Sequence, residues 1–115
     1  MAISAAYENS ASISTTEYSL PNVSTGLTPI TVDGIYQAFI DLGAMVAGDQ
    51  YVIQLKEKVT SAGTQRLVEE WIVTGAQSKP CFVIPSMILL HGWDITMKRL
   101  LGADRTIGWS IRSVA

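Results

Sequence analysis

Turn-forming residues divide the chain from residue 31 onward into short segments, and this spacing limits what the chain can fold into. Clusters of Gly, Ser, Asp and Pro recur about every ten residues, the spacing typical of short strands joined by turns. Between turns, apolar and polar side chains alternate. In residues 51–59, Tyr51, Ile53, Leu55 and Val59 share one face, which we expect to point into a core. The pattern predicts an all-β protein, an antiparallel β-sandwich of jelly-roll-like form.

Seven segments read as strands. They cover residues 35–42, 51–59, 65–73, 81–84, 87–90, 93–100 and 105–114. The first also fits helical spacing, but Gly43 and Gly48 leave room only for a very short helix, so we predict a strand. Pro85 separates 81–84 from 87–90, which are therefore predicted as two strands. Within 93–100, Asp94 and Thr96 are expected to face outward.

Residues 1–30 differ from the rest of the chain. They contain ten Ser or Thr residues and only two charged residues. This composition predicts an extended N-terminal arm over 1–30, followed by a β-sandwich domain over 31–115. The arm has few apolar side chains and no evident core of its own. Its larger apolar residues are therefore candidate protein-interface residues: Tyr7, Ile13, Tyr18 and Leu20.

Charge is distributed unevenly along the chain. Residues 1–50 hold five acidic residues and no Lys or Arg, whereas residues 51–115 hold all eight basic residues and the other five acidic ones. Such asymmetry favours association between unlike surfaces. The basic residues are interspersed with acids, so nucleic-acid binding is not expected. The longest apolar run, near residues 87–90, is too short to span a membrane.

The sequence offers few residues for catalysis. One His (His91) and one Cys (Cys81) do not form a zinc-ligand set, and no phosphate-binding or nucleophile motif occurs. Residues 91–94 are interpreted as a turn that starts a strand. Glu69 and Glu70 are adjacent in a strand and point to opposite faces, so they cannot act as a carboxylate pair. We predict no enzymatic activity, no cofactor and no metal.

Three further expectations concern single side chains. Cys81, within an apolar run, is expected to be buried. Glu57 is expected either at an exposed strand end or paired with Arg66 across a hairpin. The three Trp residues are in phase with apolar neighbours and are expected in the core, whereas Trp side chains exposed in a groove would indicate carbohydrate binding. These residues are Trp71, Trp93 and Trp109.

Scattered short segments resemble small virion proteins of tailed bacteriophages over about residues 33–115. The segments are Gly34-Ile35-Tyr36-Gln37, Asp41-Leu42, Gly48-Asp49, Gly63-Thr64-Gln65-Arg66, Gly75-Ala76-Gln77, His91-Gly92-Trp93-Asp94 and Trp109-Ser110-Ile111-Arg112. The resemblance implies a capsid decoration, cement or minor capsid subunit that bridges shell proteins. Its partners would be the major capsid protein or other virion proteins, with a homo-oligomer, for example a trimer, as the expected state.

The same resemblance implies a location on the capsid surface or at the head-tail region, after synthesis in the cytoplasm of a bacterial host. It carries no catalytic residues over to this chain. A head-tail connector or tail component remains an alternative, as does a carbohydrate- or receptor-binding module on a virion fibre.

Overall fold

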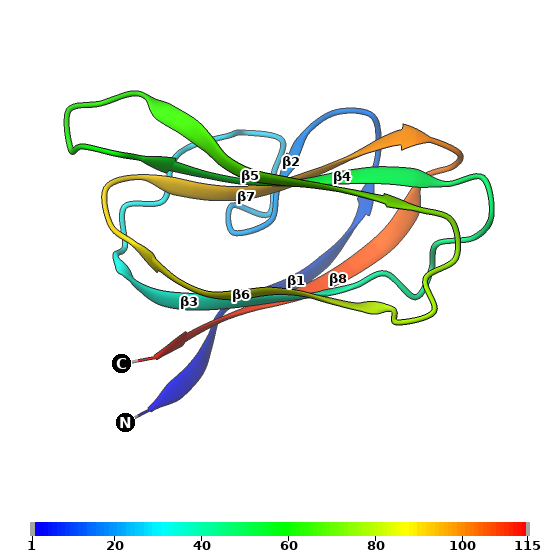
Figure 1. The fold of residues 1–115 in the computed structure, drawn as a ribbon, viewed down its shortest axis with the longest axis horizontal. Coiled ribbons are helices and arrows are strands. Elements are labelled where there is room, and N and C mark those ends of the chain that lie inside the picture. The colour runs from blue at the N-terminus through cyan, green and yellow to red at the C-terminus, as the bar shows by residue number, and fades with distance from the viewer. Residues whose placement is uncertain (1, 115) are drawn as a thin grey trace.

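The computed structural model describes residues 2–114, and these form eight strands and no helix (Figure 1). The strands are β1 (Ile3–Ile13), β2 (Tyr18–Ser19), β3 (Gly34–Asp41), β4 (Gln50–Lys58), β5 (Gln65–Thr74), β6 (Cys81–Leu89), β7 (Trp93–Leu101) and β8 (Arg105–Val114). Within this described part of the chain, nothing forms a helix able to cross a membrane.

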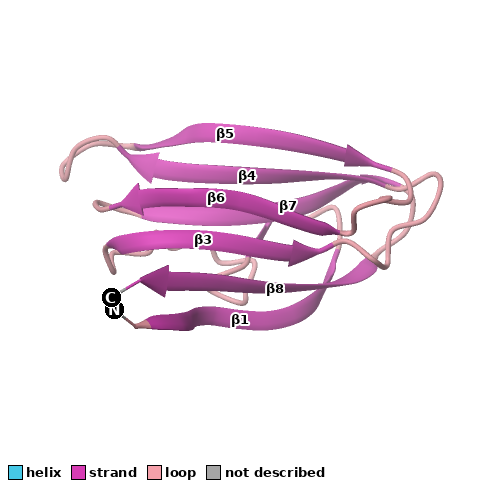
Figure 2. Cartoon of the chain, turned by 60° about the horizontal axis from the view of Figure 1, so that its bottom comes forward, coloured by secondary structure: helices cyan, strands magenta, loops and turns pink. Residues whose placement is uncertain are grey.

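The strands form two antiparallel sheets that pack face to face (Figures 1 and 2). Sheet A has the order β1-β8-β3-β6, and sheet B has the order β2-β7-β4-β5. Every connection except β4–β5 crosses from one sheet to the other, which is the strand order of a jelly roll. The predicted all-β antiparallel sandwich is therefore confirmed.

The core lies between the sheets, where alternate residues of each strand meet. Tyr36, Ala38 and Ile40 of β3 face residues of β4 and β7 that are equally buried. Trp93 is fully buried, and its ring centroid lies 4.7 Å from that of Tyr36. Trp109 is buried as well, so the core position expected for these two Trp residues is confirmed.

The N-terminal segment is extended, as expected, but it does not stand apart from the sandwich. Strand β1 pairs with β8 along its length, from Ile3 opposite Val114 to Ile13 opposite Arg105. The two-residue strand β2 pairs with β7. A boundary at residue 30 therefore does not separate two units. Tyr7, Ala11 and Ile13 of β1 face the core, and the polar residues between them hide this pattern in the composition.

Strand β6 is continuous where two strands were expected. Its pairing with β3 shifts register between Tyr36 and Ala38, opposite Met87 and Ile84, and Pro85 lies within this irregularity. Because β6 is an edge strand, a missing N–H group there leaves no neighbour unpaired. The same edge position explains why Cys81 is exposed rather than buried. Val59 is also exposed, because β4 ends at Lys58.

Candidate interaction site

Strand β5 exposes apolar side chains although it belongs to a sheet. Leu67 is 52% exposed, and Val68 and Ile72 are each 57% exposed. The strand is the edge of sheet B and pairs only with β4. The turn that joins β4 to β5 also extends beyond the neighbouring turns (Figures 1 and 2). An edge strand of this kind presents unpaired backbone groups together with apolar surface, which is what strand addition by another chain requires.

The two edge strands β5 and β6 lie on the same side of the sandwich. Trp71 of β5 and Phe82 of β6 meet edge to face, with ring centroids 5.6 Å apart. Trp71 is therefore only partly buried, which differs from the expected core position, and its ring packs against Phe82 instead of lining an open groove. Strand β6 adds exposed apolar side chains of its own, Val83 and Ile88.

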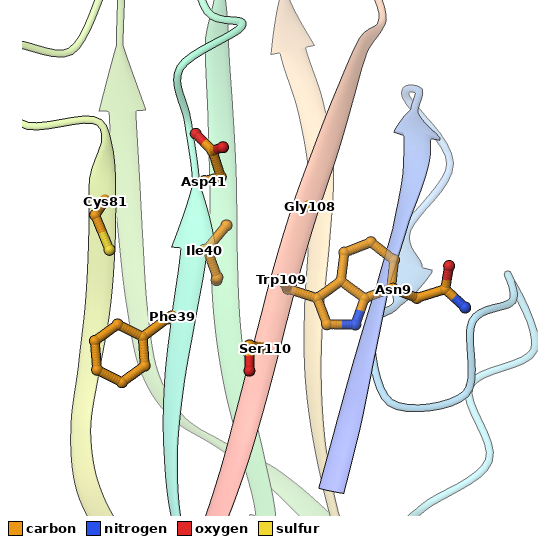
Figure 3. Close-up of a pocket in the computed structure, with 8 residues that line it drawn as sticks. All are labelled: Asn9, Phe39, Ile40, Asp41, Cys81, Gly108, Trp109 and Ser110. Atoms are coloured by element: carbon orange, nitrogen blue, oxygen red, sulfur yellow. The ribbon is translucent and has the colours of Figure 1, made fainter. Parts of the chain in front are cut away.

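A shallow hollow of about 320 Å³ lies on the outer face of sheet A (Figure 3). It crosses all four strands, and its lining consists of Asn9, Phe39, Ile40, Asp41, Cys81, Gly108, Trp109 and Ser110. The hollow exists because Gly108 has no side chain to fill it. The Arg112 guanidinium lies 3.9 Å from the centroid of the Phe39 ring and covers one of its faces. The hollow therefore combines an aromatic ring that is covered on one face with a carboxylate and a hydroxyl group.

The four predicted interface residues all lie against the inside of the sandwich. Ile13 and Leu20 are 0% exposed and belong to the core, so they are not surface anchors. Tyr7 is partly buried, with its ring 5.6 Å from that of Trp93, and Tyr18 packs edge to face on Trp109. The residues 65–73 were expected to form a strand, but β5 was not among the predicted interface residues. One signal for it was present in the sequence, because β5 carries apolar residues on both of its faces.

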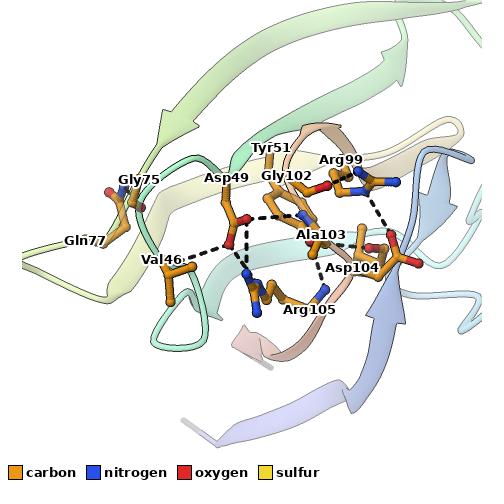
Figure 4. A network of polar contacts seen from close by, with 11 residues as sticks. Val46, Asp49, Tyr51, Gly75, Gln77, Arg99, Gly102, Ala103, Asp104 and Arg105 are labelled. Carbon is orange, nitrogen blue, oxygen red and sulfur yellow. Dashed lines mark hydrogen bonds and ion pairs between the residues drawn. The ribbon is translucent and has the colours of Figure 1, made fainter.

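A network around Asp49 ties together the loops at one end of the sandwich (Figure 4). The Asp49 carboxylate accepts hydrogen bonds from Arg105 Nε at 2.8 Å, from the Val46 amide at 3.0 Å and from the Ala103 amide at 3.2 Å. The Arg105 guanidinium and these amides outweigh burial and hold the pKa of Asp49 well below its usual range. The Tyr51 hydroxyl donates to the Ala103 carbonyl and accepts from the Arg105 amide. These groups are saturated with partners, so the network holds the loops and offers no free group for chemistry.

A second polar cluster lies on the outer face of sheet B, where residues 17–22 fold over β7. Ser19 Oγ donates to Asp94 Oδ1 at 2.7 Å, and Glu17 accepts from Lys56 at 2.6 Å and also from Thr96. Asp94 and Thr96 do point outward, as predicted, but this segment buries both of them.

The second carboxylate oxygen of Asp94 has no hydrogen-bond partner. Burial accordingly raises the pKa of Asp94 to about 6. For Glu17, the contacts with Lys56 and Thr96 outweigh a desolvation that acts in the opposite direction, and its pKa is lowered. The cluster is a buried anchor for the N-terminal segment, and Asp94 is the group in it whose charge is least compensated.

The remaining candidates have structural roles. Glu57 lies opposite Arg66 in the β4–β5 pairing, but its carboxylate accepts from the amides of Leu90 at 2.6 Å and Gly92 at 2.8 Å, which fixes the β6–β7 turn. Trp93 begins β7 and enters the core, as the interpretation of residues 91–94 expected. Within residues 2–114, no three His, Cys, Asp or Glu side chains are placed to hold a metal ion.

The strand order and the edge strands together define a β-sandwich of jelly-roll topology with apolar side chains exposed along its edge strands β5 and β6. No family model, curated protein or solved structure matches the chain.

Proposed function

We propose that this chain is a structural subunit that binds other protein chains of a larger assembly, with the edge strand β5 as its main contact. The observation that carries the proposal is the exposure of Leu67, Val68 and Ile72 along a strand that has only one neighbour. A partner strand added there would satisfy the unpaired backbone groups and cover these three side chains. Removing the apolar surface of these side chains from water would favour the association.

The setting we propose is the virion of a tailed bacteriophage, at the capsid surface or the head-tail region. The support for it is the resemblance of short segments to small virion proteins, together with the strand order. Jelly rolls occur in viral capsid proteins and also in lectins, so the fold by itself does not select between a shell role and sugar binding. In the proposed setting the protein acts as a decoration, cement or minor capsid subunit that bridges the major capsid protein.

Carbohydrate binding has less support as an alternative. Trp93 and Trp109 are buried, and Trp71 packs against Phe82. None of the three presents the open aromatic platform that sugar stacking uses. A role as head-tail connector or tail component uses the same kind of contact. It differs in copy number, because a connector occurs as one ring in each particle and a decoration protein occurs in many copies over the shell.

The experiment that tests the proposal is co-sedimentation with shells of the major capsid protein, using wild type, Ile72→Lys and Val68→Lys. A charge on β5 opposes burial against a partner strand, so we expect each variant to lose at least tenfold in shell binding. Thr64→Lys is the matched control, since Thr64 is an exposed polar residue immediately before β5, and it should bind like wild type. If the β5 variants bind undiminished while remaining folded, β5 is not the contact. Counting copies in each particle then separates the shell from the connector role.

A further inference from the structure

The outer face of sheet A is divided into an apolar half and a half of small polar residues. By strand alternation, β3 and β6 present Ile35, Phe39, Val83 and Ile88 on this face. Strands β8 and β1 present Ser10, Ser12, Thr106 and Ser110, with Gly108 between them, and also the charged residues Glu8 and Arg112. Phe39 also lines the hollow, with its ring turned toward β6 and away from Gly108 (Figure 3). A hollow of this size can receive one long side chain from a facing chain.

Two side chains of opposite charge lie on this face, near Phe39 and the hollow. In the β3–β8 pairing, Phe39 lies opposite Ser110, Asp41 lies opposite Gly108, and Arg112 lies opposite Gln37. Asp41 and Arg112 thus lie on opposite sides of the Phe39–Ser110 pair along the strands, and both side chains are exposed. When two copies of the face meet about a two-fold axis between them, Arg112 of each copy can oppose Asp41 of the other. With that axis running across the strands at the Phe39–Ser110 pair, each Arg112 lies over the hollow at Gly108 of the facing copy, beside Asp41, and the two Phe39 side chains face each other.

We infer that the outer face of sheet A binds a second copy of this chain, forming a two-fold dimer centred on Phe39, Gly108 and the Asp41–Arg112 charge pair. This inference rests on the proposed role as an assembly subunit and names one of its partners. It uses a surface different from β5, so the two contacts can coexist in one assembly.

The available area suits a dimer of modest affinity. Four strands about 4.8 Å apart, each contributing about eight residues at about 3.3 Å, give a face of roughly 500 Å². Two such faces bury about 1,000 Å², near the lower limit for specific interfaces. Two-fold pairing is the commonest arrangement of identical chains, and it uses each attractive contact twice. The dimer should therefore form in the micromolar range and dissociate on dilution.

The first test is analytical ultracentrifugation of wild type and Gly108→Leu between about 1 and 200 µM protein, a range that brackets micromolar affinity. A Cβ atom at residue 108 would approach nothing closer than 3.9 Å, so Leu fits the fold and fills the hollow. We expect wild type to shift from monomer to dimer over this range and Gly108→Leu to remain monomeric. Ser61→Leu is the matched control, because it adds the same side chain at an exposed position of the β4–β5 turn, outside sheet A, and it should dimerise like wild type.

The second test exchanges the charges. Asp41→Arg and Arg112→Asp should each weaken dimerisation at least tenfold, through like-charge repulsion across the axis. The double variant restores opposite charges and should recover most of the loss. A recovery of this kind is a property of the pair and is not expected from a general loss of stability. Circular dichroism melting of each variant establishes that it is folded.

Cys81 provides a readout on the unmodified protein. It lines the hollow and is exposed in the monomer, so its rate of alkylation by a maleimide should fall as protein concentration rises into the dimer range. A wild type that stays monomeric to 200 µM, a dimer unaffected by Gly108→Leu, or a double charge variant without recovery would each overturn the inference. Ile72→Lys separates the two proposals. It should dimerise normally while losing shell binding, so failure of the dimer and failure of the β5 contact are distinguishable.

Discussion

Arg105, at the start of β8, donates two hydrogen bonds to Asp49, which precedes β4 in the opposite sheet. The distances are 2.8 Å from Nε to Oδ2 and 3.3 Å from Nη2 to Oδ1. Asp49 is 1% exposed, whereas the Arg105 side chain is 30% exposed. The pair therefore joins the two sheets at one end of the sandwich, with the carboxylate buried and the guanidinium at the surface.

Replacing Asp49 should destabilise the fold. Asp49→Ala removes the acceptor for Arg105 and for the Val46 and Ala103 amides, and we expect a loss of about 2–4 kcal/mol in the free energy of unfolding. Urea denaturation at pH 7 measures this loss. Asp104→Ala is the control, because Asp104 also pairs with an arginine, Arg99, but at an exposed site. It should change stability by less than about 1 kcal/mol. Equal losses at the two sites would show that the buried network has no special weight.

The Asp49 pKa also predicts an acid limit for the fold. Its pKa is lowered in the folded state, so its contribution to stability is present above the ordinary Asp pKa and is lost as pH falls below about 4. Wild type should therefore lose stability on acidification below pH 4 more steeply than Asp49→Ala. Unfolding free energies measured from pH 5 to pH 2 test this difference in slope.

Titration of Asp94 should lower the free energy of unfolding as pH rises, the opposite of the effect of Asp49. Its folded pKa of about 6 lies above the ordinary Asp pKa of 3.8, so the folded state binds this proton more tightly than the unfolded state. The resulting stabilisation is complete below pH 3.8 and is lost as pH rises through 6. Relative to Asp94→Asn, wild type should lose about 1–3 kcal/mol between pH 4 and pH 7.5. Urea titrations of both proteins across this range provide the comparison, and parallel pH profiles would contradict the raised pKa.

Substitutions at two glycines with positive φ distinguish the cost of backbone strain from the cost of a steric clash. Gly102 has φ +89°, and a Cβ atom there would lie 2.2 Å from Asp49 Oδ1 and 2.7 Å from Asp49 Cα. Gly48 has φ +94°, but a Cβ atom there would have no atom within 4 Å. Gly48→Ala should cost about 1–2 kcal/mol from strain alone. Gly102→Ala must also displace Asp49 and should cost at least about 2 kcal/mol more, measured as the difference in unfolding free energy.

The N-terminal strand can be tested by a pair of Ile residues at its two ends. Ile13 is fully buried, and Ile3 is 71% exposed. Ile13→Ala should destabilise by about 2–4 kcal/mol, whereas Ile3→Ala should change stability by less than about 0.5 kcal/mol. Deleting residues 2–30 removes Ile13, Leu20 and the pairing partner of β8, so we expect the truncated chain not to fold. A truncated chain with a native-like melting transition would show that residues 1–30 are dispensable for the sandwich.

The fold class could be predicted from sequence because strand alternation and turn residues are local signals. Ile53 and Leu55 alternate with the polar residues Gln54 and Lys56, and both are buried as expected. The position of β1 could not be predicted in this way. Its inward residues are few and separated by Ser and Ala, and its partner β8 lies at the other end of the chain. A pairing over that separation is decided by which sheet edge is left open, and local composition does not contain this information.

For the candidate surfaces, too, the sequence determined some features and the tertiary structure determined others. The sequence by itself determined that the chain is rich in strands and turns, contains few residues suited to catalysis, and carries apolar residues on both faces of 65–73. Only the tertiary structure decided that this segment is an edge strand, that Gly108 leaves a hollow beside Phe39, and that Asp94 is buried under residues 17–22. The physical reason is that burial depends on which strands become neighbours. In a jelly roll, nearly all neighbours are distant in sequence.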